Sequence, residues 1–194
     1  PTEEMLETAV KRGQYLTYQQ ELGEVGNLVM RARDVVPGLK YFVPFVKTPT
    51  NIAKFSLERT PLNFPRVIAK AISGDLKGAA LSEELAKPML GSLLGFSVYQ
   101  LADLGLVTGG GPKDKAEREA KQNTGWLPYS FKGKDGTYYS FARLEPLGSI
   151  LGLAASFNEL QKEMTEDERF NVAAGIAGAI TENISNKTFM QGFT

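Results

Sequence analysis

Apolar residues recur three and four positions apart along most of the chain, which is the spacing of one face of an α-helix. Helix-start signals accompany the pattern. Thr2 precedes two glutamates, and Thr165 opens a Thr-Glu-Asp-Glu sequence typical of a capping box. Prolines and glycines separate the apolar segments. The pattern predicts helices over residues 2–22, 24–36, 51–58, 64–74, 75–106, 144–164 and 166–184.

Two segments break the helical pattern. Residues 37–50 combine prolines with aromatic side chains, and Pro44 excludes an ordinary central strand, so we expect an extended or broken connector there. Aromatic residues flank Gly133-Lys-Asp-Gly136, which predicts a β-hairpin over about residues 128–141. The expected fold class is therefore mainly α: a multi-helix, bundle-like domain with one small β-hairpin.

Three glycines and a proline at 109–112 are the clearest break in the chain, and a charged stretch follows them. We interpret residues 109–123 as a hinge and charged linker. This division leaves an N-terminal helical part at 1–108, which contains the connector, and a hairpin with a C-terminal helical pair at 124–194. Because the chain begins at Pro1 and ends without a polar tail, we expect it to be a segment of a larger protein.

Small residues lie four positions apart on three of the predicted helices. Glycine is about 1 kcal/mol less favourable than alanine in a helix interior, so these pairs favour close approach of two backbones. Two interpretations remain open: tight packing inside a soluble domain, or helices that meet lipid. Against a membrane span, residues 89–107 are nearly long and apolar enough but include Asp103. The helix-packing candidates are Gly91, Gly95, Gly148, Gly152, Ala174 and Gly178.

The amino-acid composition excludes several kinds of catalytic and metal-binding site. The 194 residues include no histidine and no cysteine, which excludes a zinc site of these ligands, a disulfide, a cysteine nucleophile and a histidine base. The glycines before Lys113 lack the spacing of a phosphate-binding loop, and no serine lies in a G-x-S-x-G context. We predict that this segment has no catalytic, metal-binding or cofactor-binding residue and no small-molecule substrate. Any enzymatic domain would lie elsewhere in the parent chain.

Charge is balanced overall but unevenly distributed. The chain has 22 basic and 22 acidic residues, which argues against a general nucleic-acid binder. Residues 31–70 hold eight basic and two acidic residues, a net charge of +6, whereas residues 141–194 hold four basic and seven acidic residues, a net charge of −3. The basic stretch either forms a solvated face or contacts a partner or nucleic acid. The candidate contacts are Arg31, Arg33, Lys40, Lys47, Lys54, Arg59, Tyr41, Phe42 and Phe45.

The hairpin concentrates aromatic side chains, which either cap the helical core or anchor a partner. As interface candidates we single out Trp126, Tyr129, Tyr138 and Tyr139.

Several short motifs resemble a region of very large proteins encoded by tailed bacteriophages and prophages. They include Val107-Thr-Gly-Gly-Gly-Pro112 and Thr124-Gly-Trp-Leu-Pro-Tyr-Ser130, together with residues 42–61, 139–148 and 186–192. In order and spacing, over about residues 40–192, they resemble the helical region described as a large polyvalent protein-associated domain.

The resemblance implies a segment of an internal virion protein that is ejected with the genome. Such proteins are packed in the capsid or portal core and are thought to build a conduit across the host envelope. The implied partners are further copies and the portal, core or tail proteins, with the host membrane and phage DNA as additional candidates. The implied location is the virion, followed by delivery to the host cell envelope. Two alternatives stay open: a non-catalytic accessory domain of a giant phage enzyme, lytic or nucleic-acid-processing, and a membrane-active helical module.

Overall fold

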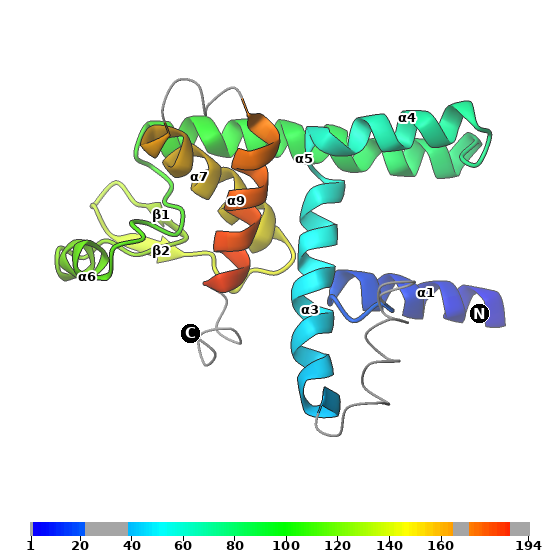
Figure 1. Ribbon diagram of the computed structural model, residues 1–194, viewed down its shortest axis with the longest axis horizontal. Coiled ribbons are helices and arrows are strands. Elements are labelled where there is room, and N and C mark those ends of the chain that lie inside the picture. Colours follow the sequence, from blue (N-terminus) through cyan, green and yellow to red (C-terminus); the bar gives the residue numbers. More distant parts are fainter. Residues whose placement is uncertain (1, 22–38, 165–170, 187–194) are drawn as a thin grey trace. The chain divides into compact units, whose positions relative to one another are not determined.

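The computed structural model describes residues 2–21, 39–164 and 171–186, and for residues 39–46 it describes the backbone alone. Over these residues the chain is mainly α-helical with one two-stranded antiparallel β-hairpin, which confirms the predicted fold class (Figure 1). The chain divides into two compact units: residues 1–55 with 188–194, and residues 56–187. The predicted helix at 24–36 and the capping box at Thr165 lie outside the described residues.

Aromatic contacts hold the first unit together. It contains α1 (Glu3–Leu16) and most of α3 (Leu39–Glu58), whose last three residues belong to the second unit. The rings of Tyr15 and Tyr18 lie 5.4 and 5.3 Å from the ring of Phe55, measured between centroids. Asn51 donates hydrogen bonds from Nδ2 to the carbonyl oxygens of Tyr18 and Gln20, at 3.0 and 2.7 Å. These contacts join the end of α1 to the later turns of α3.

The prediction of a broken connector at 37–50 was wrong over residues 39–50, and residues 37 and 38 lie outside the described part of the chain. Helix α3 runs without interruption from residue 39 to residue 58, so Pro44 and Pro49 lie inside it. A proline removes one hydrogen bond from the helical ladder and is normally disruptive. Here the helix is long, and the side chains of Asn51 and Phe55 are buried near its end, so the remaining bonds and this packing keep it helical.

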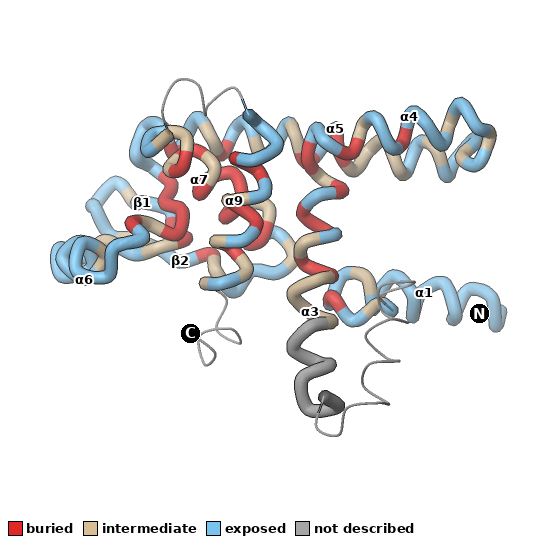
Figure 2. The backbone as a smooth tube through the Cα atoms, viewed as in Figure 1, coloured by how far each residue is buried: buried red, intermediate tan, exposed pale blue. Residues whose placement is uncertain are grey.

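Three helices form the framework of the second unit: α5, α7 and α9. Helix α7 packs against both α5 and α9, and α4 lies along α5. Buried residues concentrate on α7, on the facing sides of α5 and α9, and in the loop after α5 (Figure 2). The elements of this unit are η1 (Pro61–Asn63), α4 (Phe64–Ile72), α5 (Gly78–Asp103), α6 (Lys115–Asn123), β1 (Ser130–Lys132), β2 (Tyr138–Ser140), α7 (Leu147–Glu163) and α9 (Val172–Ser185).

The hairpin connects to the loop after α5. Ser130 pairs with Ser140, and Lys132 pairs with Tyr138. The extended segment 106–108 runs beside β1, where Thr108 N–H donates to the Ser130 carbonyl at 2.9 Å. Phe141, at the end of the hairpin, is completely buried in a cluster with side chains of α5 and α7. Phe141 therefore attaches the base of the hairpin to the core of the second unit.

The glycines at 109–111 do not lie at the boundary between the two units, where a hinge would be expected. The division between the two units falls at residues 55 and 56, and the three glycines lie within the second unit. Gly109 and Gly110 are buried against α7, as described below. The charged stretch that follows forms the short helix α6, whose N-cap Asp114 accepts a hydrogen bond from the Glu117 N–H at 2.8 Å.

Candidate functional site

Helix α5 exposes an apolar face. Leu90 and Leu93 are each 66% exposed, and Leu104 is 72% exposed. A helix that is apolar around its circumference normally has every side covered, whereas α7 and α4 cover only part of α5. Contiguous exposed apolar side chains are a common mark of an interaction surface. We define the α5 apolar face as Met89, Leu90, Leu93, Phe96 and Leu101 together with Leu104, which is the C-cap of α5.

Helix α5 meets α7 through polar contacts as well as apolar ones. Asp103, which argued against a membrane span in the sequence, pairs with Lys162 of α7 at 3.2 Å, and the hydrogen bond from Lys162 lowers the pKa of that carboxyl. Among the described residues, no helix combines the length and the apolar character that crossing a bilayer requires.

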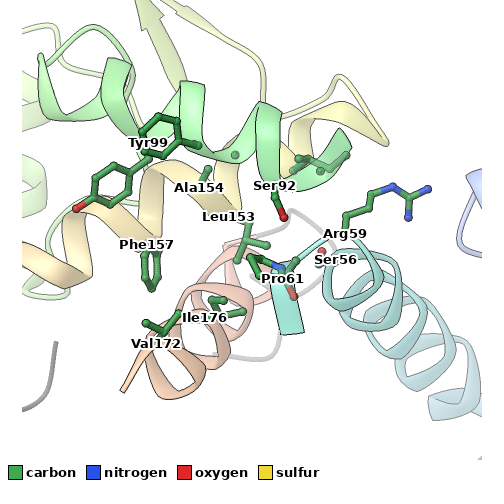
Figure 3. Close-up of a pocket in the computed structure, with 15 residues that line it drawn as sticks. Ser56, Arg59, Pro61, Ser92, Tyr99, Leu153, Ala154, Phe157, Val172 and Ile176 are labelled. Carbon is green, nitrogen blue, oxygen red and sulfur yellow. The ribbon is translucent and has the colours of Figure 1, made fainter. Parts of the chain in front are cut away.

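A pocket of about 300 Å³ opens among α5, α7, α9 and the turn that follows α3. Figure 3 shows Leu153, Ala154, Phe157 and Ile176 around it, with Tyr99 at one side. Gly91, Ser92 and Gly95 contribute the α5 wall. The lining is therefore apolar for the most part, and its α5 side combines these small residues with the rings of Phe96 and Tyr99.

One polar atom in this lining has no hydrogen-bond partner within the described part of the chain. The Oγ atom of Ser92 is buried and makes no hydrogen bond. By contrast, Ser97 on the same helix donates to the Leu93 carbonyl at 3.0 Å, as helical serines commonly do. Buried polar groups are nearly always hydrogen-bonded, so Ser92 is an exception that requires a physical reason.

A second cluster surrounds the glycine loop. The Glu159 carboxylate accepts hydrogen bonds from Gly109 N–H at 2.8 Å and from Gly111 N–H at 2.9 Å. Gly110 N–H donates to Ser156 Oγ at 3.2 Å. Any side chain at Gly110 would collide with Glu182. The loop is thus fixed on α7 by side chains that satisfy its backbone donors.

Two carboxyl groups in this cluster have raised pKa values. Burial raises the pKa of Glu182 to about 7, and repulsion from Glu159 adds to the rise, while Arg118 and Lys113 partly offset it. Burial also raises the pKa of Glu159, against the effect of its two backbone hydrogen bonds.

A buried phenol completes this cluster. Asn186 donates from Nδ2 to Tyr129 Oη at 2.9 Å, and burial raises the pKa of Tyr129. Neither Glu159 nor Glu182 lines the pocket. Across residues 2–21, 39–164 and 171–186, no group of acidic side chains is arranged to hold a metal ion. We interpret the cluster as a structural anchor for the glycine loop.

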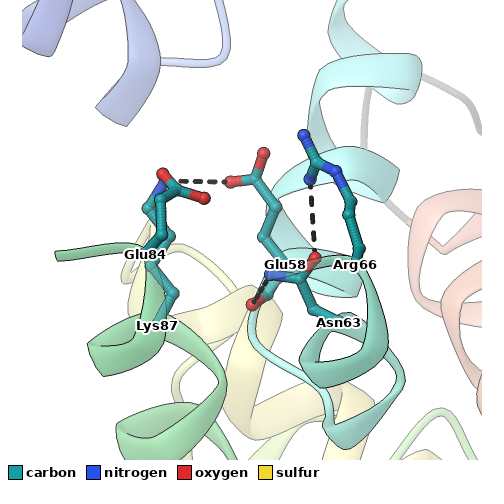
Figure 4. Close-up of polar contacts among 5 residues, drawn as sticks. All are labelled: Glu58, Asn63, Arg66, Glu84 and Lys87. Atoms are coloured by element: carbon teal, nitrogen blue, oxygen red, sulfur yellow. Dashed lines mark hydrogen bonds and ion pairs between the residues drawn. The ribbon is translucent and has the colours of Figure 1, made fainter. Parts of the chain in front are cut away.

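Charged residues also join the end of α3 to α5. The buried Glu58 carboxylate lies 3.7 Å from the Lys87 ammonium, which also contacts Glu84 (Figure 4). Asn63 donates to the Glu58 carbonyl at 3.0 Å, and Arg66 donates to Asn63 at 3.4 Å. This network fixes the turn that forms one wall of the pocket.

The small residues predicted at helix contacts divide into two groups. A side chain at Gly91 would collide with the Arg59 backbone, one at Gly148 with the Phe141 carbonyl, and one at Gly152 with Asn183. At these three positions a neighbouring segment lies where a side chain would be. Gly95 and Gly178 leave ordinary space, with nearest atoms at 3.9 and 3.4 Å. Ala174 is exposed, and its neighbour Gly175 instead faces Phe157.

The predicted basic and aromatic contacts are only partly described. Arg31 and Arg33 lie outside the described residues, as do the side chains of Lys40, Tyr41, Phe42 and Phe45. Lys47 pairs with Glu21 at 2.7 Å, and Lys54 is exposed. Arg59, in the second unit, is half-buried and lines the pocket. A nucleic-acid surface on this stretch therefore stays a prediction.

The hairpin aromatics have different environments. Tyr129 belongs to the core, so it is not available to a partner, and Trp126 is half-buried beside Gly111. Tyr138 is half-buried, and Tyr139 is 58% exposed. Of the four interface candidates, Tyr139 is the one with most of its surface open to a partner.

Sequence reasoning did not identify the pocket. Gly91 and Gly95 were visible as a packing signal, and Phe157 and Ile176 lie far from them in sequence. Comparisons of the chain with protein-family models, with curated proteins and with solved structures find no match.

Proposed function

We propose that this chain is a non-catalytic helical interaction segment of a tailed-phage virion protein, and that it assembles with further copies or with portal, core or tail proteins during genome delivery. The observation that carries the interaction part is the α5 apolar face. Leu90, Leu93 and Leu104 are each about two thirds exposed or more. Burying such side chains contributes about 1.5–3 kcal/mol each, so a partner that covers this face gains substantial free energy.

The phage part of the proposal is supported by the motif resemblance over about residues 40–192. The composition is compatible with it, because a chain without cysteine has no disulfide to restrict passage through a narrow channel. The packing of α5 supports the interaction part. Helices α7 and α4 and the turn η1 contact α5, and its exposed leucines remain outside these contacts.

Site-specific photo-crosslinking tests this proposal in the phage that encodes the chain. A photoreactive amino acid replaces Leu93 on the α5 apolar face, and a matched variant carries it at Gln122, an exposed position on α6. We expect covalent adducts from position 93 that contain a second copy or another virion protein, identified by mass spectrometry, and few from position 122.

Two results would contradict the proposal. Absence of the parent polypeptide from purified virions would remove the assignment to a virion protein. Equal crosslinking from positions 93 and 122, with the parent present in virions, would remove the α5 apolar face as the interaction surface.

A further inference from the structure

We propose that α5 pairs with α5 of a second copy of this chain, in antiparallel orientation, about a two-fold axis that passes beside Ser97. This inference rests on the proposed function and deepens it, because it names the partner of the α5 apolar face. The contact surface is the α5 seam, which we define as Leu90, Leu93, Ser97, Leu101 and the C-cap Leu104.

The residues of the α5 seam lie on one narrow side of the helix. At about 3.6 residues per turn, their positions fall within an arc of about 80° around the helix axis. The buried residues Val98 and Ala102, which cluster with Ala154 of α7, lie roughly 120° from the centre of that arc. Pairing along the seam therefore leaves the contacts between α5 and α7 in place.

The spacing of the α5 seam is the same in both directions along the chain. Its members are three, four, four and three residues apart, with Ser97 at the centre. In an antiparallel pair with the axis at Ser97, Leu90 faces Leu104 of the second copy, and Leu93 faces Leu101 of the second copy. A two-fold interface requires a surface that is complementary to itself, whereas an unrelated partner imposes no such symmetry. The spacing therefore favours a second copy as the occupant.

Ser97 suits a position on the axis. Its side chain is small, so the two helices can approach to an interaxial distance of about 8 Å, the short end of the usual range. Its hydroxyl already donates to the Leu93 carbonyl at 3.0 Å, so covering Ser97 leaves no donor unpaired. Spacings of three and four residues are also those of a coiled-coil seam, in which the side chains of one helix fit between those of the other.

No charge interrupts the α5 seam. Between residues 89 and 102, the exposed polar residues of α5 are Ser97 and Gln100. Asp103 lies beside the seam and pairs with Lys162 of α7. Depletion of charged residues is typical of the centre of a protein interface, and two copies meet here without like-charge repulsion.

The area of the α5 apolar face corresponds to a weak dimer interface. Its six side chains are 37–72% exposed, so the face presents roughly 550 Å² if a large apolar side chain has about 150 Å². Standard interfaces bury about 800 Å² per partner, and weak, transient ones less than about 600 Å². We therefore expect a reversible dimer with a dissociation constant of about 10–100 µM.

Analytical ultracentrifugation of the 194-residue chain tests the association. We expect the wild type to change from monomer to dimer between about 1 and about 500 µM. Leu93→Lys places a charge in the α5 seam and should weaken association at least about tenfold. Ile72→Lys is the matched control, because Ile72 is an 82% exposed apolar residue of α4 outside the seam, and it should associate like the wild type. Circular dichroism checks that each variant keeps its helices.

Single cysteines test the two-fold geometry, because the chain has no cysteine of its own. Under oxidising conditions we expect a disulfide-linked dimer of Ser97→Cys, since the two copies of a residue on the axis lie within reach of a disulfide. Leu90→Cys alone should not crosslink, because antiparallel pairing places its two copies about 21 Å apart along the helices. A mixture of Leu90→Cys and Leu104→Cys should crosslink, and Gln122→Cys on α6 gives the background.

A wild type that stays monomeric up to about 500 µM would overturn the inference, as would wild-type association of Leu93→Lys. Crosslinking of Ser97→Cys no stronger than that of Gln122→Cys, or no stronger than that of Leu90→Cys alone, would also overturn it. These failures differ from failure of the proposed function. A monomeric chain whose photo-adducts from position 93 contain another virion protein leaves the proposed function standing, whereas absence of the parent from virions leaves the association of the purified chain unaffected.

Discussion

Glu182 makes the free energy of unfolding of the second unit depend on pH. Its pKa is raised from 4.5 to about 7 by burial and by Glu159. The folded protein therefore keeps a proton that the unfolded chain has lost between these two values. The free energy of unfolding falls as the pH rises from about 4.5 to about 7, and it stays at the lower level above that range.

The size of the effect follows from the same two pKa values. Each pH unit corresponds to about 1.4 kcal/mol, so the interval from 4.5 to about 7 sets an upper limit of about 3.4 kcal/mol. Glu182 is only half-buried, and solvent screening reduces the effect to about 1–2 kcal/mol. Glu182→Gln cannot ionise. We therefore expect this variant to be more stable than the wild type by that amount at about pH 8, with little difference near pH 4.5.

Urea unfolding followed by tryptophan fluorescence measures the difference in stability between Glu182→Gln and the wild type. Trp126 is the single tryptophan of the chain, and it packs beside Gly111 in the loop that Glu159 anchors. Burial also raises the pKa of Glu159, so Glu182→Gln should reduce the pH dependence without abolishing it. Glu119→Gln, at an exposed position of α6, is the control and should keep the wild-type profile. A wild-type stability that is equal at about pH 5 and about pH 8 would refute the reasoning.

Two further substitutions test the packing of the second unit. Gly110→Ala places a methyl group against Glu182 and within 2.8 Å of Asn186 Nδ2, so we expect a loss of about 1–3 kcal/mol in urea unfolding. An unchanged midpoint would mean that the loop is not held against α9. Lys87→Met removes an ion pair from the buried Glu58 and should lower stability by about 1–3 kcal/mol in thermal unfolding. A variant as stable as the wild type would show that the contact with Lys87 contributes nothing to folding.

Local signals in the sequence predicted local structure well. Gly133 and Gly136 flank the turn of the hairpin, where Gly133 N–H donates to the Thr137 carbonyl at 2.7 Å. Pro65 lies in the first turn of α4, where its missing N–H leaves no helical bond unmade. Such features depend on neighbouring residues, so their physical causes can be read directly from the sequence.

Features that depend on distant residues could not be predicted in this way. The three glycines resemble a hinge because glycine is flexible by itself, yet Glu159, 50 residues after Gly109, fixes the loop. Pro44 suggested a broken segment, although the helix around it is continuous. The pocket depends on side chains from four elements, and the spacing within any one of them gives no sign of a cavity.

The anchoring of the glycine loop also has a consequence for the order of events during synthesis on the ribosome. Gly109 and Gly111 leave the ribosome well before Glu159, and Gly110 precedes the Ser156 hydroxyl by 46 residues. Until α7 is available, the N–H groups of Gly109, Gly110 and Gly111 lack the acceptors that hold them in the folded protein. Domains fold as units during translation, and closing such long-range contacts is slow compared with forming a helix. In the nascent chain α5 therefore has η1 and α4 available before α7 is made, so the side that α7 later covers is exposed during that interval together with the α5 apolar face.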